Sequence, residues 1–140
     1  MSISNLNLAD SMGILREGKL GMLGCIAAGE PYVVPVNYYF DGQDLYLHSL
    51  PGKKIQALRV NPRVCFQVCE IQSPYHWRSV IAYGNYEEIS GEQEREVALA
   101  RLYRSLPHLS PVESKQIKDP REIIVFRIKV DEITGLGEDW

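Results

Sequence analysis

The stretch YVVPVNYYF at residues 32–40 restricts the fold of this 140-residue chain more than any other segment. Its β-branched and aromatic residues favour a strand, and both faces of that strand would be apolar. Pro35 has no N–H to donate to a neighbouring strand, so we expect the segment at a sheet edge or a bulge. One face can fill a core, and the other then needs a cover, such as a partner subunit or a flat ligand.

Five further segments have the composition of strands, at residues 20–27, 45–48, 63–69, 77–89 and 122–130. Residues 63–69 alternate Val and Phe side chains with Cys and Gln, which is the period-two pattern of a strand. The sequence DGQD at 41–44 predicts a hairpin turn. Strands and helices do not alternate regularly, so we expect an antiparallel sheet that hides its edges in a closed or partly closed barrel.

Three helices are expected beside these strands. The first lies between the candidate caps Ser4, Asn5 and Asn7 and the stop signal Gly18. The second spans residues 52–60, and the third follows Ser90, which can cap it.

The bulk composition is that of a single folded domain spanning residues 1–140. A net charge of −3 and a pI near 5.6 argue against nucleic acid or an anionic membrane as the main partner. Three cysteines form no Cys-x-x-Cys pair, so we expect free thiols in a reducing compartment. The first 18 residues lack the features of a signal peptide, which predicts a cytoplasmic protein. The three histidines lack metal-ligand spacing, and no metal site is expected.

The first candidate site is HSLPGKKIQALR at residues 48–59. A strand ends at His48 and Ser49, and Lys53 and Lys54 open a helix after Gly52. The free N–H groups of a helix start, together with two ammonium groups, can hold a phosphate. The alternative is that both lysines only solvate the first turn, although the positive end of the helix dipole disfavours cations there.

Two other segments could contact a planar ligand. Main chain beside Pro35 could bind the polar rim of a ring, and the Asn37 amide offers both a donor and an acceptor. At the start of the 77–89 strand, Trp77 could cover an aromatic ligand, while Arg78 and Ser79 could hold a phosphate or a ring carbonyl. Taken alone, the Pro35 segment fits an ordinary edge proline beside a solvated Asn better than a ligand contact. The Trp77 segment fits a strand start with a surface aromatic equally well.

Taken in order, these segments resemble the pyridoxamine 5′-phosphate oxidase-like FMN-binding split-barrel superfamily, and most closely its branch of nitroimidazole-resistance proteins. The resemblance covers roughly residues 8–106. The matching motifs are GKLGMLG, PYVVPVNYYF, LYLHSLPGKKIQAL, NPRVCFQV and RSVIAYG.

This resemblance implies a mainly β fold, a six-stranded antiparallel Greek-key split barrel with flanking helices. It also implies a homodimer with two FMN molecules in the subunit interface. The residues expected around the flavin are Val34, Val36 and Asn37 at the isoalloxazine ring, His48, Ser49, Lys53 and Lys54 at the phosphate, and Trp77, Arg78 and Ser79 from the other subunit.

The same resemblance implies a flavin-dependent oxidoreductase acting on a small molecule such as a nitroaromatic or a quinone, with His48 as a possible proton donor. The Arg-x-His motif that binds substrate in pyridoxamine phosphate oxidases does not occur in this sequence, which argues against vitamin B6 oxidation. Two rivals stay open. One is a non-catalytic barrel that carries FMN or haem, and the other is an interaction domain without a cofactor.

Overall fold

The computed structural model describes residues 2–105 and 123–139. The eight strands are β1 (Ile3–Asn5), β2 (Leu20–Ala27), β3 (Glu30–Asn37), β4 (Tyr39–Phe40), β5 (Leu45–Ser49), β6 (Arg63–Ser73), β7 (His76–Glu88) and β8 (Ile124–Glu138). The three helices are α1 (Leu8–Glu17), α2 (Lys53–Val60) and α3 (Glu92–Ser105). Glu122, which begins the last predicted strand, and His108 lie outside the described residues.

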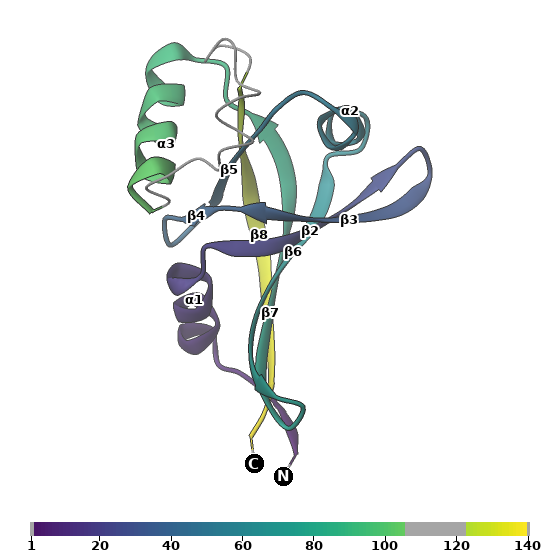
Figure 1. Ribbon diagram of the computed structural model, residues 1–140, viewed down its shortest axis with the longest axis vertical. Helices are drawn as coiled ribbons and strands as arrows, with labels where there is room; N and C mark the ends of the chain where they lie inside the picture. Colours follow the sequence, from purple (N-terminus) through teal and green to yellow (C-terminus); the bar gives the residue numbers. More distant parts are fainter. Residues whose placement is uncertain (1, 106–122, 140) are drawn as a thin grey trace.

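All strands join one sheet in the order β3-β2-β6-β7-β8-β5-β4, with β1 added to β8, and every pairing is antiparallel. Figure 1 shows β7 and β8 running along the length of the molecule, with β2 and β3 crossing them. The β6–β7 hairpin reaches the end where both termini lie, and α2 and α3 lie toward the opposite end (Figure 1). The mainly β, antiparallel prediction is confirmed.

The prediction of a six-stranded split barrel, closed or partly closed, differs from the structure in two respects. The sheet has eight strands, because β1 was not predicted and the 32–40 segment divides into β3 and β4. The division falls at Tyr38, whose side chain turns into the core and donates a 2.6 Å hydrogen bond to the Leu15 carbonyl. The sheet is also not closed, because its end strands β3 and β4 follow one another through Tyr38 and do not pair among the described strands.

The last strand is longer than predicted, since β8 continues past residue 130 to Glu138. A register shift separates two parts of its ladder with β7, at Tyr83 and Gly84. A side chain at Gly84 would overlap the Lys129 carbonyl oxygen, so only glycine fits at this register shift. The extended part of β8 then pairs with both β1 and the start of β7.

The main core lies on the inner side of the sheet, between the curled strands, α1 and α2. Phe66 and Tyr38 pack edge to face with their ring centroids 5.0 Å apart, and both are fully buried. The Phe66 ring occupies the space where a side chain at Gly21 would stand. Asn7, one of the predicted caps, precedes the α1 helix, and its side chain accepts the Asp10 N–H at 2.7 Å.

A smaller core joins α3 to the opposite side of the sheet, around Ile89, Ala98, Ile123 and Val125. Tyr46 and Leu99 pack against it. The sheet is therefore covered on its inner side by the main core and on part of its other side by α3.

The rest of that other side stays uncovered in one copy of the chain. Successive residues of a strand point to opposite faces, so the neighbours of the core residues in β2, β3, β6 and β8 point away from the core. We call this surface the outer apolar face; its exposed members are Leu20, Met22, Ile26, Val33, Ile71 and Leu136.

Candidate functional site

The start of α2 is the most cationic part of the candidate site. Gly52 precedes the helix in an extended conformation, and no side chain caps the first turn. The Nζ of Lys53 lies 4.8 Å from the centroid of the Tyr32 ring at the beginning of β3. Ile55 and Leu58 pack in the main core and hold the helix against the sheet. Uncapped N–H groups and two ammonium groups are the donor set that a phosphate requires, so these residues fit the predicted ligand group.

Lys54 differs from Lys53 in its surroundings. Lys54 is half-buried and Lys53 is exposed. Burial lowers the pKa of Lys54, and the nearby Cys25 thiol partly opposes this shift. Burial likewise raises the pKa of Cys25, and Cys65 adds to the increase. An anion placed next to Lys54 would favour its charged form.

The β3 strand supplies a free edge beside these lysines. It is the end strand of the sheet and pairs only with β2 along the described path, which confirms the edge position predicted for Pro35. Val34 and Val36 pack their side chains toward the core, so only their main chain faces the edge. Asn37 ends the strand and donates its side-chain N–H to the Lys19 carbonyl at 3.1 Å.

His48 and Ser49 end β5, and their side chains leave the strand on opposite faces. The His48 ring packs edge to face with Tyr103 of α3, with centroids 6.0 Å apart. The Ser49 hydroxyl donates to the Leu50 carbonyl at 2.8 Å. A proton-donor role for His48 stays a prediction.

The third predicted group lies at the other end of the molecule, at the start of β7 (Figure 1). The Trp77 indole N–H donates to Glu138 at 3.0 Å, and Arg78 forms an ion pair with Glu70. Ser79 accepts a hydrogen bond from Gln67 at 2.9 Å. Because adjacent strand residues face opposite ways, Arg78 points to the inner side, while Ser79 points to the outer apolar face.

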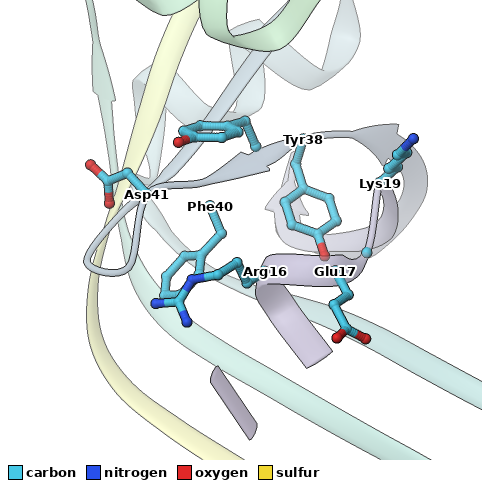
Figure 2. A pocket seen from close by; sticks show the side chains of 8 residues that line it. Arg16, Glu17, Lys19, Tyr38, Phe40 and Asp41 are labelled. Carbon is cyan, nitrogen blue, oxygen red and sulfur yellow. The ribbon is translucent and has the colours of Figure 1, made fainter. Parts of the chain in front are cut away.

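Three hollows lie near these groups. One, of about 340 Å³, is lined by Arg78 together with Ser4 and Glu138. The one in Figure 2 lies between the end of α1 and β4, with Arg16 and Asp41 to one side and Lys19 to the other. Its volume of about 170 Å³ is below the range of ordinary ligand pockets. An apolar hollow of about 340 Å³ lies against Tyr32 and is also lined by Cys65 and Tyr83.

Two residues that contact the candidate groups, Tyr32 and Gln67, were not predicted from the sequence. Tyr32 was visible only as part of an aromatic-rich strand, and its contact with Lys53 depends on how α2 packs. Gln67 was visible as a polar residue on the non-core side of its strand, but its bond to Ser79 needs the β6–β7 register.

Within residues 2–105 and 123–139, His, Cys, Asp and Glu side chains form no cluster of three that could hold a metal ion. Within the same ranges, no helix has the length and apolar character needed to cross a membrane.

A sequence model of the pyridoxamine 5′-phosphate oxidase family matches residues 8–136. The chain belongs to this family. The resemblance seen in the sequence motifs is thereby confirmed. An uncharacterized protein of Rhizobium meliloti, RA0666, is 33% identical over 145 residues, covering 96% of this chain and 95% of the relative.

Solved structures agree with this family assignment. An FAD-binding protein from Mesorhizobium loti is 29% identical, with a TM-score of 0.83 over 99% of this chain and 100% of that one. A candidate 5-nitroimidazole antibiotic resistance protein from Bacteroides thetaiotaomicron is 24% identical, with a TM-score of 0.76 over 98% and 89% of the two chains. The second similarity establishes the shared fold.

Proposed function

We propose that this family member binds FMN between the two copies of a twofold dimer and catalyses electron transfer to a small acceptor, such as a nitroaromatic or a quinone. The observation that carries the proposal is the separation of the candidate groups. Lys53 and Lys54 begin α2, which lies toward one end of a long molecule (Figure 1). Ser79 belongs to the first part of β7, which starts at the hairpin near the other end. Two copies packed side by side in opposite directions would bring the lysines of each next to the partner's Ser79 group.

The outer apolar face supports such a pairing. A twofold interface uses the same patch on both copies, and this face carries six large exposed apolar side chains, including Val33 and Ile71. Ser79 points to this face, at the end opposite α2. A second copy would cover apolar surface and complete each site in the same step.

The dimensions of β3 suit an elongated ligand. From Tyr32 to Asn37 the strand spans about 16 Å, at roughly 3.3 Å per residue. A phosphate held at the start of α2 would place an attached ring system along the free edge of β3, where main-chain groups can meet its polar rim. When bound, the flavin supplies hydride or electron transfer, and the protein binds and orients it.

The name of the Mesorhizobium loti relative supports a flavin and leaves two candidates, FMN and FAD. We infer FMN, because the cationic group at α2 consists of two lysines at a single helix start. Extraction of the cofactor from purified protein, followed by mass spectrometry, should give FMN. Recovery of FAD would contradict the choice of FMN while leaving a flavin site.

We also place the protein in the cytoplasm, in line with its three free cysteines. Cell fractionation checks this, and recovery outside the cytoplasm would contradict it.

Subunit complementation tests the shared site. Lys53→Ala with Lys54→Ala should abolish flavin retention, and so should Ser79→Glu in otherwise native chains. Heterodimers of these two variants contain one site with both changes and one site with neither. We therefore expect one flavin per heterodimer, measured by absorbance after separation with two affinity tags.

Other outcomes contradict particular parts of the proposal. If each site lay within one chain, every site of the heterodimer would be damaged and no flavin would be retained. If either homodimer kept its full flavin content, those residues would not belong to the site. Gln72→Glu, exposed on the same hairpin, is the control for added charge. Oxidation of NAD(P)H with an added acceptor then distinguishes an enzyme from a flavin carrier.

A further inference from the structure

Gln67 and Ser79 form a polar pair within the outer apolar face. They lie on adjacent strands, and the Gln67 side-chain N–H donates to the Ser79 hydroxyl oxygen at 2.9 Å. Their nearest neighbours across the strands are apolar. Met22 lies opposite Gln67, and Leu136 lies opposite Ser79. Both polar side chains are half-buried even in one copy of the chain.

This bond determines what the pair can offer to a ligand. Because the Ser79 oxygen accepts the Gln67 N–H, its own O–H is directed to another acceptor. Gln67 keeps its side-chain carbonyl as an acceptor. Within the part of the chain that the structure describes, neither side chain has a second hydrogen bond to protein. If a second copy covers this face, both groups need new partners, since buried unpaired polar groups are unfavourable.

An acceptor beside an O–H donor complements an N–H group next to a carbonyl. The imide edge of an isoalloxazine ring carries this arrangement at N3 and its adjacent carbonyls. Neither the phosphate tail nor the dimethylbenzene end of a flavin offers it. Within the oxidised ring system only the imide edge has an N–H donor, so it is the part of the ring that suits the pair. The ribityl hydroxyls can also donate and accept, and the comparison of FMN with N3-methyl-FMN distinguishes the two.

We propose that Gln67 recognises the flavin together with Ser79: the Gln67 carbonyl accepts the flavin N3–H, and the Ser79 O–H that Gln67 orients donates to a neighbouring flavin carbonyl. This inference rests on the proposed function, because the flavin is held mainly by the partner copy. It assigns to Gln67 a role that the sequence motifs do not indicate.

Flavin affinity, measured by fluorescence quenching with FMN and with N3-methyl-FMN, tests the assignment. Wild-type protein should bind N3-methyl-FMN about fivefold to tenfold more weakly than FMN, the effect of one lost hydrogen bond. Gln67→Met keeps the side-chain length and removes the amide. It should bind FMN more weakly by a similar factor and should no longer distinguish the two flavins.

Gln67→Glu tests the direction of the Ser79 hydrogen bond. A carboxylate cannot donate, so it would accept a hydrogen bond from the Ser79 O–H and leave no O–H for the ligand. A second carboxylate oxygen can still accept the flavin N3–H, so Gln67→Glu should still bind N3-methyl-FMN more weakly than FMN. Adding Ser79→Ala should weaken FMN binding in the wild-type background but not in the Gln67→Glu background, and an equal loss in both would overturn the orienting role of Gln67. Gln72→Met, exposed on the same strand, should bind both flavins as wild type does.

Each outcome has a distinct meaning. If wild-type protein binds FMN but binds N3-methyl-FMN equally well, or if Gln67→Met matches wild type, the pair is a structural contact satisfied by water. The recognition role is then overturned while the flavin site stands. If wild-type protein binds neither flavin, the proposed function and this inference both fail. Thermal melting and sedimentation of every variant separate these results from misfolding or loss of the dimer.

Discussion

Met22 and Leu23 are neighbours in β2 and lie on opposite faces of the sheet. Leu23 is fully buried between Phe66 and the rest of the inner core, whereas Met22 is 38% exposed on the outer apolar face. Both faces of the strand are apolar, but only one of them is covered by this chain. The comparison shows that apolar composition alone does not define a core. The outer apolar face has the composition of a buried surface, although no part of the chain that the structure describes covers it.

The largest expected effect is on the inner face. Leu23→Ala removes a fully buried side chain, so we expect the free energy of unfolding to fall by about 2–5 kcal/mol. Met22→Ala should cost clearly less in dilute protein, where the outer face is free. Urea denaturation at two protein concentrations checks this. A dimer would make the Met22→Ala effect grow with concentration, and equal losses for both variants would contradict the two-face description.

The next effect concerns association through the outer apolar face. Val33→Asp combined with Leu136→Asp places two carboxylates on this surface, and burial of unpaired charge is unfavourable. We expect dimer dissociation to become at least about 100-fold more favourable, equivalent to roughly 2.7 kcal/mol. Analytical ultracentrifugation measures it. Glu96→Asp on α3 is the control, and an unchanged dimer in the double variant would exclude this face as the interface.

A smaller effect is expected from pH, through Lys54. Burial lowers its pKa in the free protein, and a bound phosphate would favour the protonated form. Near the lowered pKa, a larger fraction of Lys54 is therefore protonated in the complex than in the free protein. Flavin affinity should fall as the pH rises through this lowered pKa, by at most about tenfold per pH unit. Titrations above pH 7.5 avoid ionisation of the phosphate itself. Lys54→Arg keeps the charge and should remove the dependence; a persistent slope would assign it to another group.

The smallest effect is in thiol reactivity. Cys69 is exposed on the non-core side of β6, while Cys25 is buried and burial raises its pKa. With a chromogenic disulfide reagent, we expect Cys69 to react first and Cys25 only on unfolding, because the thiolate is the reactive form. Cys69→Ser identifies the fast phase. If a second copy covers the outer face, that phase should slow with increasing protein concentration; rapid reaction of Cys25 would contradict its burial.

Much of the fold could be predicted because its signals are local. The alternation in β6, the DGQD turn and the Asn7 cap each depend on a few neighbouring residues, and each is present in the structure. The errors came from interactions between distant segments. Tyr38 interrupts the 32–40 strand because its hydroxyl meets Leu15, and β8 extends to Glu138 because β1 and β7 lie on either side of it.

The candidate site divides in the same way. The sequence indicated Lys53, Lys54 and Asn37 as candidates for a phosphate and a ring, through the helix start and the edge proline. The structure adds that Val34 and Val36 turn their side chains into the core, and that Arg78 and Ser79 point to opposite faces. Strand alternation predicts that the side chains of adjacent residues point to opposite faces of the sheet. Only the packed sheet shows which of the two faces the core.

By itself, the sequence determined the family, a mainly antiparallel sheet, a cationic helix start and a strand that Pro35 confines to a sheet edge. These follow from motifs and periodicities that act over a few residues. The tertiary structure alone decided that the sheet stays open at Tyr38, that Gln67 holds Ser79, and that the lysines and Ser79 lie toward opposite ends of the molecule. Those features depend on register and on the curl of the whole sheet, which result from contacts between segments far apart in the chain.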